Sequence, residues 1–423
     1  MLTSLTVENW KSFEKATLNI DALTVLIGTN ASGKSNLLEA LAFLSRTAHG
    51  ISLTAALRGD GVILPLRGGL EWAAHQPGDC FAIGITYGVG RKWEHAYRIE
   101  CIIHENRCDL ISEELTFTEF DLNANNQRIA VVDRAQILFK TSNALLTAQS
   151  IDAHLLNGDY GRRQTFERSY SIASQLLSQR THSQLDQGLR DVLDAIKGVF
   201  LLDPNPNHMR GFSSLSHRLE SDGSNIAGVI AALSADEQPE IANILTDYAS
   251  KLPELDVARV YAETVGKFNT DAMLYCDERF QAAGKPSTVD ARTMSDGTLR
   301  FLAILTALLT RPSNSLLIIE DVDNGLHPSR SELLLRMLRK VGQERGVDIL
   351  VTTHNPALLD AMGTALLPFI TVAHRAPTTG ASELTLLEDI KQLPKLLAHG
   401  RVGRLSSEGL IEQELKTPAE QAA

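Results

Sequence analysis

The pattern with the clearest chemistry is a glycine-rich stretch near the N-terminus. Residues 28–35 read Gly-Thr-Asn-Ala-Ser-Gly-Lys-Ser. This spacing, G-x-x-x-x-G-K-S, is that of a P-loop, in which glycines let the backbone curl so that its N–H groups surround phosphate oxygens. Lys34 is then expected to contact the β and γ phosphates, and the Ser35 hydroxyl to bind Mg²⁺. The pattern predicts a site for a nucleoside triphosphate.

The flanking residues predict the strand and helix that must position this loop. Residues 23–27 are a short apolar run, which is typical of a buried parallel strand, and residues 36–44 have the composition of a helix. The N-terminal dipole of that helix would add to the phosphate site. A glycine-rich turn without function is the alternative, and both flanking elements disfavour it. We expect the nucleotide to contact Gly28, Asn30, Ala31, Ser32, Gly33, Lys34, Ser35 and Asn36.

A second group of chemical residues follows an apolar run in the C-terminal half. Residues 316–319 are Leu-Leu-Ile-Ile, and Glu320 and Asp321 come next. P-loop enzymes need one acid near the Mg²⁺ ion, and often a second that orients or deprotonates the attacking water. We expect Glu320 to bind Mg²⁺ and Asp321 to act as the base, at the end of a strand in the P-loop sheet. A strand that ends in an ordinary acidic turn is the alternative.

Two further motifs lie on either side of this acid pair. Ser295, Asp296 and Gly297 open a strongly apolar helix, for which Ser295 is a good N-cap. His354 follows the apolar run of residues 348–353 and can hydrogen-bond a γ-phosphate or water. Taken alone, the first motif would be a well-capped core helix, and a lone histidine would more often be structural. Their order around the acid pair favours a place in the nucleotide site for both.

The composition narrows the class of protein. The chain has 423 residues, of which 43% are hydrophobic and 22% charged, as in ordinary soluble globular proteins. Its net charge of −11 disfavours general attraction of nucleic acid, so any DNA contact needs a local basic patch or a partner. None of the four cysteines forms a C-x-x-C pair, which indicates free thiols in a reducing cytoplasm. No apolar run reaches about 18 residues, so no membrane span is expected.

The hydrophobic patterns divide the chain into four expected parts. Residues 1–140 form an N-terminal lobe, which contains two short strands, the P-loop and an antiparallel sheet from residue 80 onward. Residues 141–253 are expected to be mostly helical, because apolar residues recur at helical spacing. Residues 254–378 form a second lobe with the acid pair. Residues 379–423 hold a strand, a helix and a tail that we expect to be disordered from residue 416.

Weaker candidates have plainer interpretations. Lys11 could approach a nucleotide from the turn between the first two strands, but a solvated turn lysine is an equal interpretation. Gln76 could sense Mg²⁺ or water, although a loop residue is favoured. The densest basic cluster, Arg162, Arg163 and Arg168, is interpreted as a solvated face.

The order of these motifs resembles that of the ABC-type ATPase heads of the SMC, RecF and OLD group. The resemblance covers residues 1–140 and 286–375. The most similar proteins look like compact ATPases of bacterial anti-phage defence, such as the Septu-type ATPase subunit. The implied fold is α/β: a P-loop NTPase head with a mixed sheet core, an antiparallel β side element and an inserted helical subdomain. In family terms residues 28–35 are the P-loop, 295–297 the signature motif, 316–321 the Walker B strand, 324–328 the D-loop and His354 the switch histidine.

The resemblance implies a homodimer, or an oligomer of dimers, that encloses ATP and Mg²⁺. Ser295 and Gly297 of one copy would meet the γ-phosphate held by Lys34 of the other. The family usually carries Asp then Glu, so the order Glu320-Asp321 shortens the base and predicts slow hydrolysis.

Three functions agree with these motifs to different degrees. Complete ATPase motifs without an effector motif favour an ABC-type ATPase that regulates a separate nuclease or toxin in anti-phage defence, with DNA as a further candidate ligand. A RecF-like repair ATPase that acts directly on DNA is the alternative, and the acidic net charge counts against it. The large insertion argues against a transporter subunit.

Overall fold

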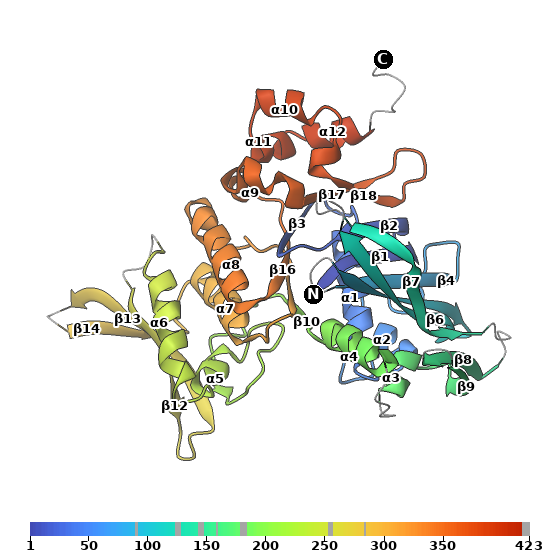
Figure 1. Ribbon diagram of the computed structural model, residues 1–423. Coiled ribbons are helices and arrows are strands. Elements are labelled where there is room, and N and C mark those ends of the chain that lie inside the picture. Colours follow the sequence, from blue (N-terminus) through green and yellow to red (C-terminus); the bar gives the residue numbers. More distant parts are fainter. Residues whose placement is uncertain are drawn as a thin grey trace. The chain divides into compact units, whose positions relative to one another are not determined.

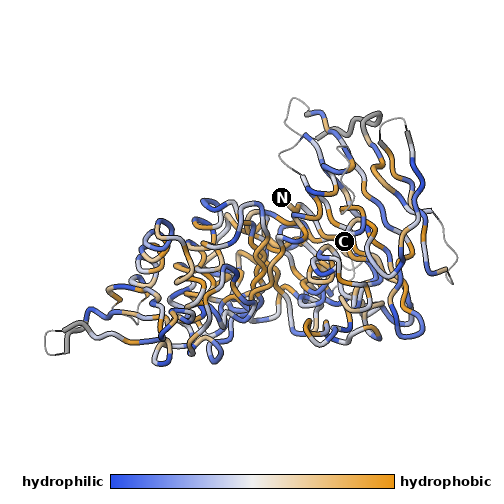
Figure 2. The backbone as a smooth tube through the Cα atoms, turned by 90° about the horizontal axis from the view of Figure 1, so that it is seen from below, coloured by the Kyte–Doolittle hydropathy of each residue, from blue (hydrophilic) through white to orange (hydrophobic). Residues whose placement is uncertain are grey.

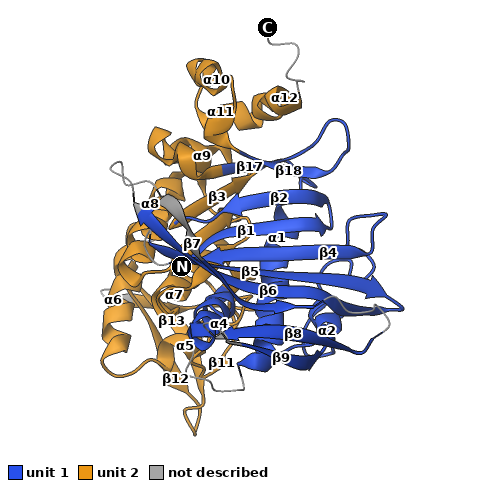
Figure 3. Ribbon diagram, turned by 45° about the vertical axis from the view of Figure 1, so that its right-hand side comes forward, with its two compact units in different colours: residues 1–21, 28–199, 371–385 blue, residues 22–27, 200–370, 386–423 orange. Residues whose placement is uncertain are grey.

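The computed structural model describes residues 1–88, 92–122, 128–142, 148–157, 160–177, 184–252, 257–282 and 285–416. The chain divides into two units, each assembled from segments that are far apart in sequence (Figure 3). Unit 1 comprises residues 1–21, 28–199 and 371–385, and unit 2 comprises residues 22–27, 200–370 and 386–423. The P-loop therefore belongs to unit 1, whereas the acid pair, the signature motif and His354 belong to unit 2.

Unit 1 is built on an eight-stranded antiparallel sheet (Figures 1 and 3). Its strands, in spatial order, are β2 (Phe13–Asn19), β1 (Leu2–Trp10), β4 (Cys80–Tyr87), β5 (Trp93–His104), β6 (Arg107–Leu122), β7 (Arg128–Thr141), β8 (Ser150–Asn157) and β9 (Tyr160–Glu167). Along β1, Leu5 and Val7 are fully buried while their neighbours are half-exposed, as a sheet with one covered face requires. The predicted antiparallel sheet is confirmed.

The hairpin of β8 and β9 corrects the expectation that residues 141–253 begin as helix. Only a few positions on these strands are apolar and buried, such as Ile151 and its cross-strand partner Phe166. β9 is the edge strand of the sheet and is rich in polar residues. Edge strands carry such residues because one side faces solvent, and this weakens the alternation by which a strand is predicted. The boundaries of the four expected parts stay a prediction.

The helices of unit 1 cover the sheet through apolar faces. α1 (Lys34–Ala48) packs on β1, and α2 (Leu53–Arg58) contacts β6. α3 (Ile172–Leu176) precedes α4 (Gln184–Lys197), which crosses β4 to β8. The apolar residues that predicted a helix in this region are buried on α4: Leu185, Leu189, Val192, Leu193 and Ile196. β10 (Val199–Leu202) follows.

Arg168 does not lie on a solvated face, contrary to our interpretation of the basic cluster. The residue is only 1% exposed, although it is an arginine. Its Nε donates to the carbonyl oxygen of Leu110 at 2.8 Å, and its Nη1 donates to that of Ala148 at 2.9 Å. Arg163, in contrast, has a 64% exposed side chain and pairs with Asp152 at 2.5 Å. Arg168 is therefore a structural residue that satisfies backbone carbonyls inside unit 1.

Replacing Arg168 is expected to destabilise the protein, because the carbonyl groups of the buried Leu110 and the half-buried Ala148 would each lose a donor. We expect Arg168→Met to lower the free energy of unfolding by about 1–3 kcal/mol. Arg163→Met is the matched control, since an exposed ion pair contributes about 0–1 kcal/mol. Urea unfolding followed by circular dichroism measures both. Equal effects of the two substitutions would contradict a structural role for Arg168.

The centre of unit 2 is a set of parallel strands, β15 (Leu316–Ile319), β16 (Asp348–Thr352) and β3 (Leu23–Ile27), paired in that order. Every residue of the three strands is buried, and their sequences are largely apolar, as predicted; Thr24, Asp348 and Thr352 are buried polar exceptions. The apolar helix α7 (Asp296–Thr310) packs against α8 (Ser331–Arg345), which in turn contacts β16. Figure 2 shows hydrophobic residues concentrated along the interior strands and helices, with hydrophilic residues on the outer turns.

A second, antiparallel sheet of unit 2 accounts for the strand-like patterns after residue 254. β13 (Asp271–Ala282) lies between β11 (Ser213–Ser214) and β12 (Val257–Val265), and it also pairs with β14 (Lys285–Asp290). α5 (Ile226–Ala231) and α6 (Glu237–Ala249) pack on this sheet.

The C-terminal region contains more helix than predicted. After α9 (Pro356–Met362) come β17 (Ile370–Arg375), the predicted strand as β18 (Ser382–Leu386) and the predicted helix as α10 (Leu393–His399). α11 (Val402–Ser407) and α12 (Leu410–Lys416) were not predicted. Of the tail predicted to be disordered, Lys416 ends α12, and residues 417–423 lie outside the described residues. None of the described helices has the length and apolar character that crossing a bilayer requires.

Candidate nucleotide-binding site

The P-loop has a tightly curled backbone that requires its two glycines. Gly28, Ala31 and Gly33 have φ values of 141°, 63° and 107°. A Cβ atom at Gly28 would lie 2.2 Å from the carbonyl oxygen of Ala373, and one at Gly33 would lie 2.8 Å from Cζ of Phe13. Both separations are too short for any other residue. The loop is thus held in one curve by its own backbone and by its neighbours in unit 1.

The interior of this curve fits an anionic ligand. The ammonium group of Lys34 donates to the carbonyl oxygens of Gly28 at 2.7 Å and Thr29 at 3.0 Å, which places it within the loop. The hydroxyl of Ser32, a residue that is 1% exposed, has no hydrogen-bond partner among the described residues. Gly33 is the N-cap of α1 and has no side chain to cap the first turn. A phosphate oxygen would supply the acceptor that Ser32 lacks, next to a helix N-terminus.

Asn36 and Lys11 position the loop and the helix that follows it. The side-chain amide of Asn36 donates to Ser12 Oγ at 2.7 Å, and the backbone carbonyl oxygen of Asn36 accepts a hydrogen bond from the Trp10 indole N–H at 2.7 Å. Lys11 forms an ion pair with Glu39 of α1, and burial lowers its pKa while Glu39 opposes that shift. Lys11 is therefore not the solvated lysine that we considered, and its contact with a nucleotide stays a prediction. A contact between Asn36 and nucleotide stays a prediction.

Arg375 supports the P-loop and was not identified from the sequence. It ends β17, and its Nε donates to the carbonyl oxygen of Ala31 at 2.9 Å. Its Nη1 donates to Gly380 at 2.8 Å. A positive charge is thereby fixed against the outside of the loop. The two partners are 344 residues apart, so no local pattern could have indicated the contact.

The structure brings Asp321 and His354 together. Their side chains approach to 3.5 Å between Nδ1 and Oδ1 and are 42% and 67% exposed, respectively. Asp321 has a φ of 45°, an uncommon conformation for a residue other than glycine, and its N–H donates to Thr352 Oγ1 at 2.8 Å. Backbone strain of this kind tends to occur at functional sites, where neighbours enforce it. The predicted base and the predicted switch histidine therefore form one group.

The loops that follow β15 and β16 are joined by a further contact that the sequence did not suggest. The Thr353 hydroxyl donates to the carboxylate of the buried Asp323 at 2.5 Å, and it accepts a hydrogen bond from the Asn355 N–H at 3.1 Å. Parallel strands end at the same edge of a sheet, and each of the three is followed by predicted residues. Glu320 follows β15, His354 lies two residues after β16, and Gly28 is the next residue after β3.

The signature motif contacts the loop that follows the acid pair. Ser295 caps α7 by accepting a hydrogen bond from the Thr298 N–H at 3.2 Å. A Cβ atom at Gly297 would lie 2.5 Å from the carbonyl oxygen of Gly325, which belongs to the predicted D-loop. Asp296 pairs with Arg210 at 2.5 Å. The helix therefore begins against a second predicted motif, and a contact between Ser295–Gly297 and a nucleotide stays a prediction.

The residues present also fit Mg²⁺. Within the described part of the chain, no three His, Cys, Asp or Glu side chains are grouped so that they could hold a metal. Mg²⁺ does not need such a group, because it usually keeps several waters and binds one or two protein oxygens together with phosphates. Ser35, in the first turn of α1, and Glu320, directly after β15, have suitable oxygens and stay the proposed ligands.

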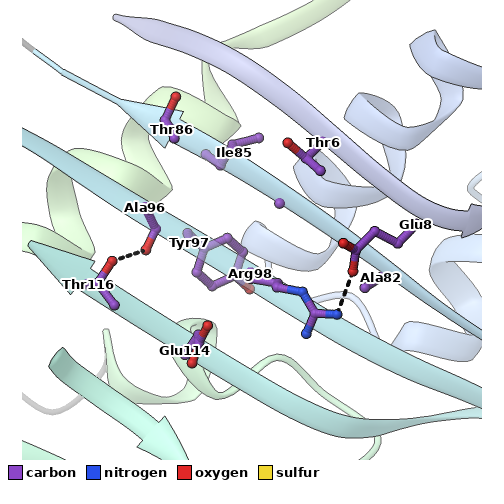
Figure 4. Close-up of a pocket in the computed structure, with 11 residues that line it drawn as sticks. Thr6, Glu8, Ala82, Ile85, Thr86, Ala96, Tyr97, Arg98, Glu114 and Thr116 are labelled. Carbon is purple, nitrogen blue, oxygen red and sulfur yellow. Dashed lines mark hydrogen bonds and ion pairs between the residues drawn. The ribbon is translucent and has the colours of Figure 1, made fainter. Parts of the chain in front are cut away.

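A separate groove of about 220 Å³ lies on the sheet of unit 1 (Figure 4). None of the predicted site residues lines it. Arg98 in this groove donates to Glu8 at 2.8 Å and to Glu100 at 2.9 Å, so its charge is already paired. The volume is below the range of about 300–1,000 Å³ that is usual for small-molecule sites. We assign no ligand to this groove.

Comparison with known proteins agrees with this geometry. Residues 23–360 match the family model described as "AAA domain, putative AbiEii toxin, Type IV TA system". The chain belongs to this AAA-domain family. Its membership, with the P-loop and the α/β architecture, confirms the predicted P-loop ATPase fold.

More distant similarities extend beyond this AAA-domain family. The lipoprotein-releasing system ATP-binding protein LolD of Myxococcus xanthus (strain DK1622) is 30% identical over 95 residues, and the match covers 22% of this chain and 42% of LolD. The chain thus spans less than half of that relative. An SMC head bound to the C-winged helix domain of ScpA superposes with a TM-score of 0.48 at 10% identity, covering 91% of this chain and 97% of the other. The SMC head domain from Thermotoga maritima gives 0.41 at 10% identity, covering 91% and 98%.

Proposed function

We propose that this AAA-domain ATPase is an ATP-dependent switch. Two copies dimerise around ATP and Mg²⁺, and the dimer regulates a separate nuclease or toxin effector in bacterial anti-phage defence. The observation that carries the proposal is the close approach of Gly297 to the carbonyl oxygen of Gly325, which leaves no room for a Cβ atom. This contact links the helix start that would meet the ATP of a second copy to the loop that follows the acid pair. Such a link is needed if hydrolysis is to control the dimer.

Each predicted residue has a task in this cycle. Lys34 and the loop N–H groups bind the phosphates, while Ser35 and Glu320 hold Mg²⁺, which neutralises charge on the phosphates. Asp321 accepts a proton from the attacking water, and that water's oxygen bonds to the γ-phosphorus as the bond to ADP breaks. His354, whose Nδ1 is 3.5 Å from Oδ1 of Asp321, donates a hydrogen bond to the γ-phosphate. The single methylene of Asp321 gives it less reach than a glutamate and supports slow hydrolysis.

Support for the effector comes from the family and from the motifs. The family description names a putative AbiEii toxin and a type IV toxin–antitoxin system, which supports a role in regulated toxicity and names no separate effector. The motifs in this chain account for ATP chemistry and leave the toxic step to another protein. The net charge of −11 suits a regulator in the cytoplasm better than a protein that binds DNA through its whole surface.

The proposed dimer is tested by measuring the molar mass of the protein in solution with different nucleotides. Light scattering after gel filtration should give a monomer with ADP and a dimer with a non-hydrolysable ATP analogue and Mg²⁺. Ser295→Arg should stay monomeric with the analogue, because a bulky side chain at the start of α7 blocks the approach of the partner's phosphate. Ser407→Arg, also at an exposed serine of unit 2, is the matched control and should dimerise. A wild-type protein that stays monomeric with every nucleotide would refute the ATP-dependent dimer.

The proposed regulation of a nuclease or toxin in anti-phage defence is tested in a separate experiment. Cells that express the chain together with its neighbouring genes are challenged with phage, and the efficiency of plating is compared with that of cells carrying Lys34→Ala. We expect protection only with the parental chain. Cleavage of DNA by the purified chain alone with Mg²⁺ would contradict a separate nuclease.

A further inference from the structure

A single arginine from a distant part of unit 2 holds the turn that precedes α7. Arg210 lies three residues before β11. Its Nη1 donates to three backbone carbonyl oxygens, those of Ala291 at 3.2 Å, Arg292 at 3.0 Å and Met294 at 2.8 Å. Its Nη2 donates to the carboxylate of Asp296 at 2.5 Å. One planar guanidinium group therefore joins the turn to the first residue of the helix, which a lysine ammonium could not do in the same geometry.

The ion pair between Arg210 and Asp296 affects how a phosphate could bind at this helix start, because Asp296 is negatively charged. A carboxylate in the first turn stabilises a helix, because it complements the positive end of the dipole. The same carboxylate would repel a phosphate that approaches this helix start. Asp296 has a 64% exposed side chain, so its charge is open to solvent at this helix start. Arg210 neutralises that charge and leaves the hydroxyl of Ser295 and the backbone of the first turn as the groups that a phosphate would meet.

We propose that Arg210 is the positioning residue of the signature motif. It fixes the turn that places Ser295 and neutralises Asp296, so that α7 can receive the γ-phosphate of an ATP molecule bound by a second copy. This inference rests on the proposed ATP-dependent dimer. It goes beyond that dimer because it makes the binding of the γ-phosphate by the shared site depend on Arg210. This residue lies 86 positions before Asp296, outside the motifs proposed to bind nucleotide.

The first test separates positioning from general stability. We expect Arg210→Ala to bind a fluorescent ATP analogue with the parental affinity, because its own P-loop is unchanged. Dimerisation with a non-hydrolysable analogue should weaken by about 10- to 100-fold, the effect of losing charge-assisted hydrogen bonds. Arg292→Ala is the matched control: Arg292 pairs with Asp290 at 2.5 Å in the same turn, and this variant should dimerise as the parent does. Parental dimerisation of Arg210→Ala would overturn the inference.

A second substitution tests the neutralisation directly. In the Arg210→Ala background, Asp296→Asn removes the unpaired carboxylate and should restore part of the lost dimerisation. A variant that fails only because the turn is disordered would gain nothing from that change. No recovery at all in the double variant would overturn the neutralising role.

Mixing experiments distinguish this inference from the dimer on which it rests. Lys34→Ala keeps its signature motif, and Arg210→Ala keeps its P-loop, so an equimolar mixture should regain ATPase activity at about a quarter of the parental sites. The mixture of Lys34→Ala with Ser295→Arg tests the shared site itself. If the Ser295→Arg mixture recovers and the Arg210→Ala mixture does not, the role of Arg210 is wrong and the dimer stands. If neither recovers, the shared site is wrong and the inference falls with it.

Discussion

Lys34→Ala is expected to abolish ATP binding. The ammonium group lies within the P-loop, 2.7 Å from the carbonyl oxygen of Gly28, where the β and γ phosphates are proposed to bind. Its removal takes away charge-assisted hydrogen bonds to those phosphates, which should raise the Kd for ATP by about 100-fold or more. Isothermal titration calorimetry with ATP and Mg²⁺ measures this change.

Lys15→Ala is the matched control for this experiment. Lys15 also belongs to unit 1, but its side chain is 72% exposed and pairs with Glu8 at 2.9 Å. We expect the control to bind ATP as the parent does. A parental Kd for Lys34→Ala would mean that residues 28–35 do not bind the triphosphate.

Asp321→Ala is expected to separate ATP binding from hydrolysis. The variant keeps the P-loop, so its Kd for ATP should stay near the parental value. Loss of the general base should lower kcat by about 100- to 10,000-fold. The ATP-bound dimer should then persist, and light scattering after gel filtration with ATP should show a dimer where the parent returns to monomer.

An acidic residue elsewhere in unit 2 controls for the change in charge. Asp247→Ala removes a carboxylate on α6 that is 59% exposed and pairs with Lys251, two residues beyond the end of that helix, and we expect this variant to hydrolyse ATP normally. Hydrolysis by Asp321→Ala at the parental rate would show that Asp321 is not the base. His354 would then be the remaining candidate within that group.

The parts of the site that consist of neighbouring residues in the sequence could be predicted, because their geometry restricts which residue types can stand at each position. The P-loop needs particular residues at fixed spacing, because Gly28 and Gly33 occupy conformations and spaces that exclude a Cβ atom. The buried strands before Gly28, Glu320 and His354 are largely apolar, because every residue in them is buried. These constraints act within a few residues, so the sequence displays them directly.

The residues that hold the site in place could not be predicted in this way. Arg375 supports Ala31, and Arg210 supports the turn before α7, but each contact joins segments that only the fold brings together. Arg168 was misinterpreted for a related reason. Its charge suggests solvent, yet the backbone carbonyls that surround it come from other strands and loops. The polar edge strand β9 was missed because few of its side chains are buried.

The hydrogen bond between Thr353 and Asp323 has a mechanical consequence. It ties the loop that carries His354 to the loop that contains Gly325, and Gly325 in turn touches Gly297 at the start of α7. A Cβ atom at Gly297 would lie 2.5 Å from the carbonyl oxygen of Gly325, so a displacement of that loop toward α7 would press on the helix start. If His354 moves when the γ-phosphate is lost, that motion would reach the start of α7, where a second copy is proposed to bind. The same small motion of these loops would then couple the cleavage of ATP to the release of the second copy.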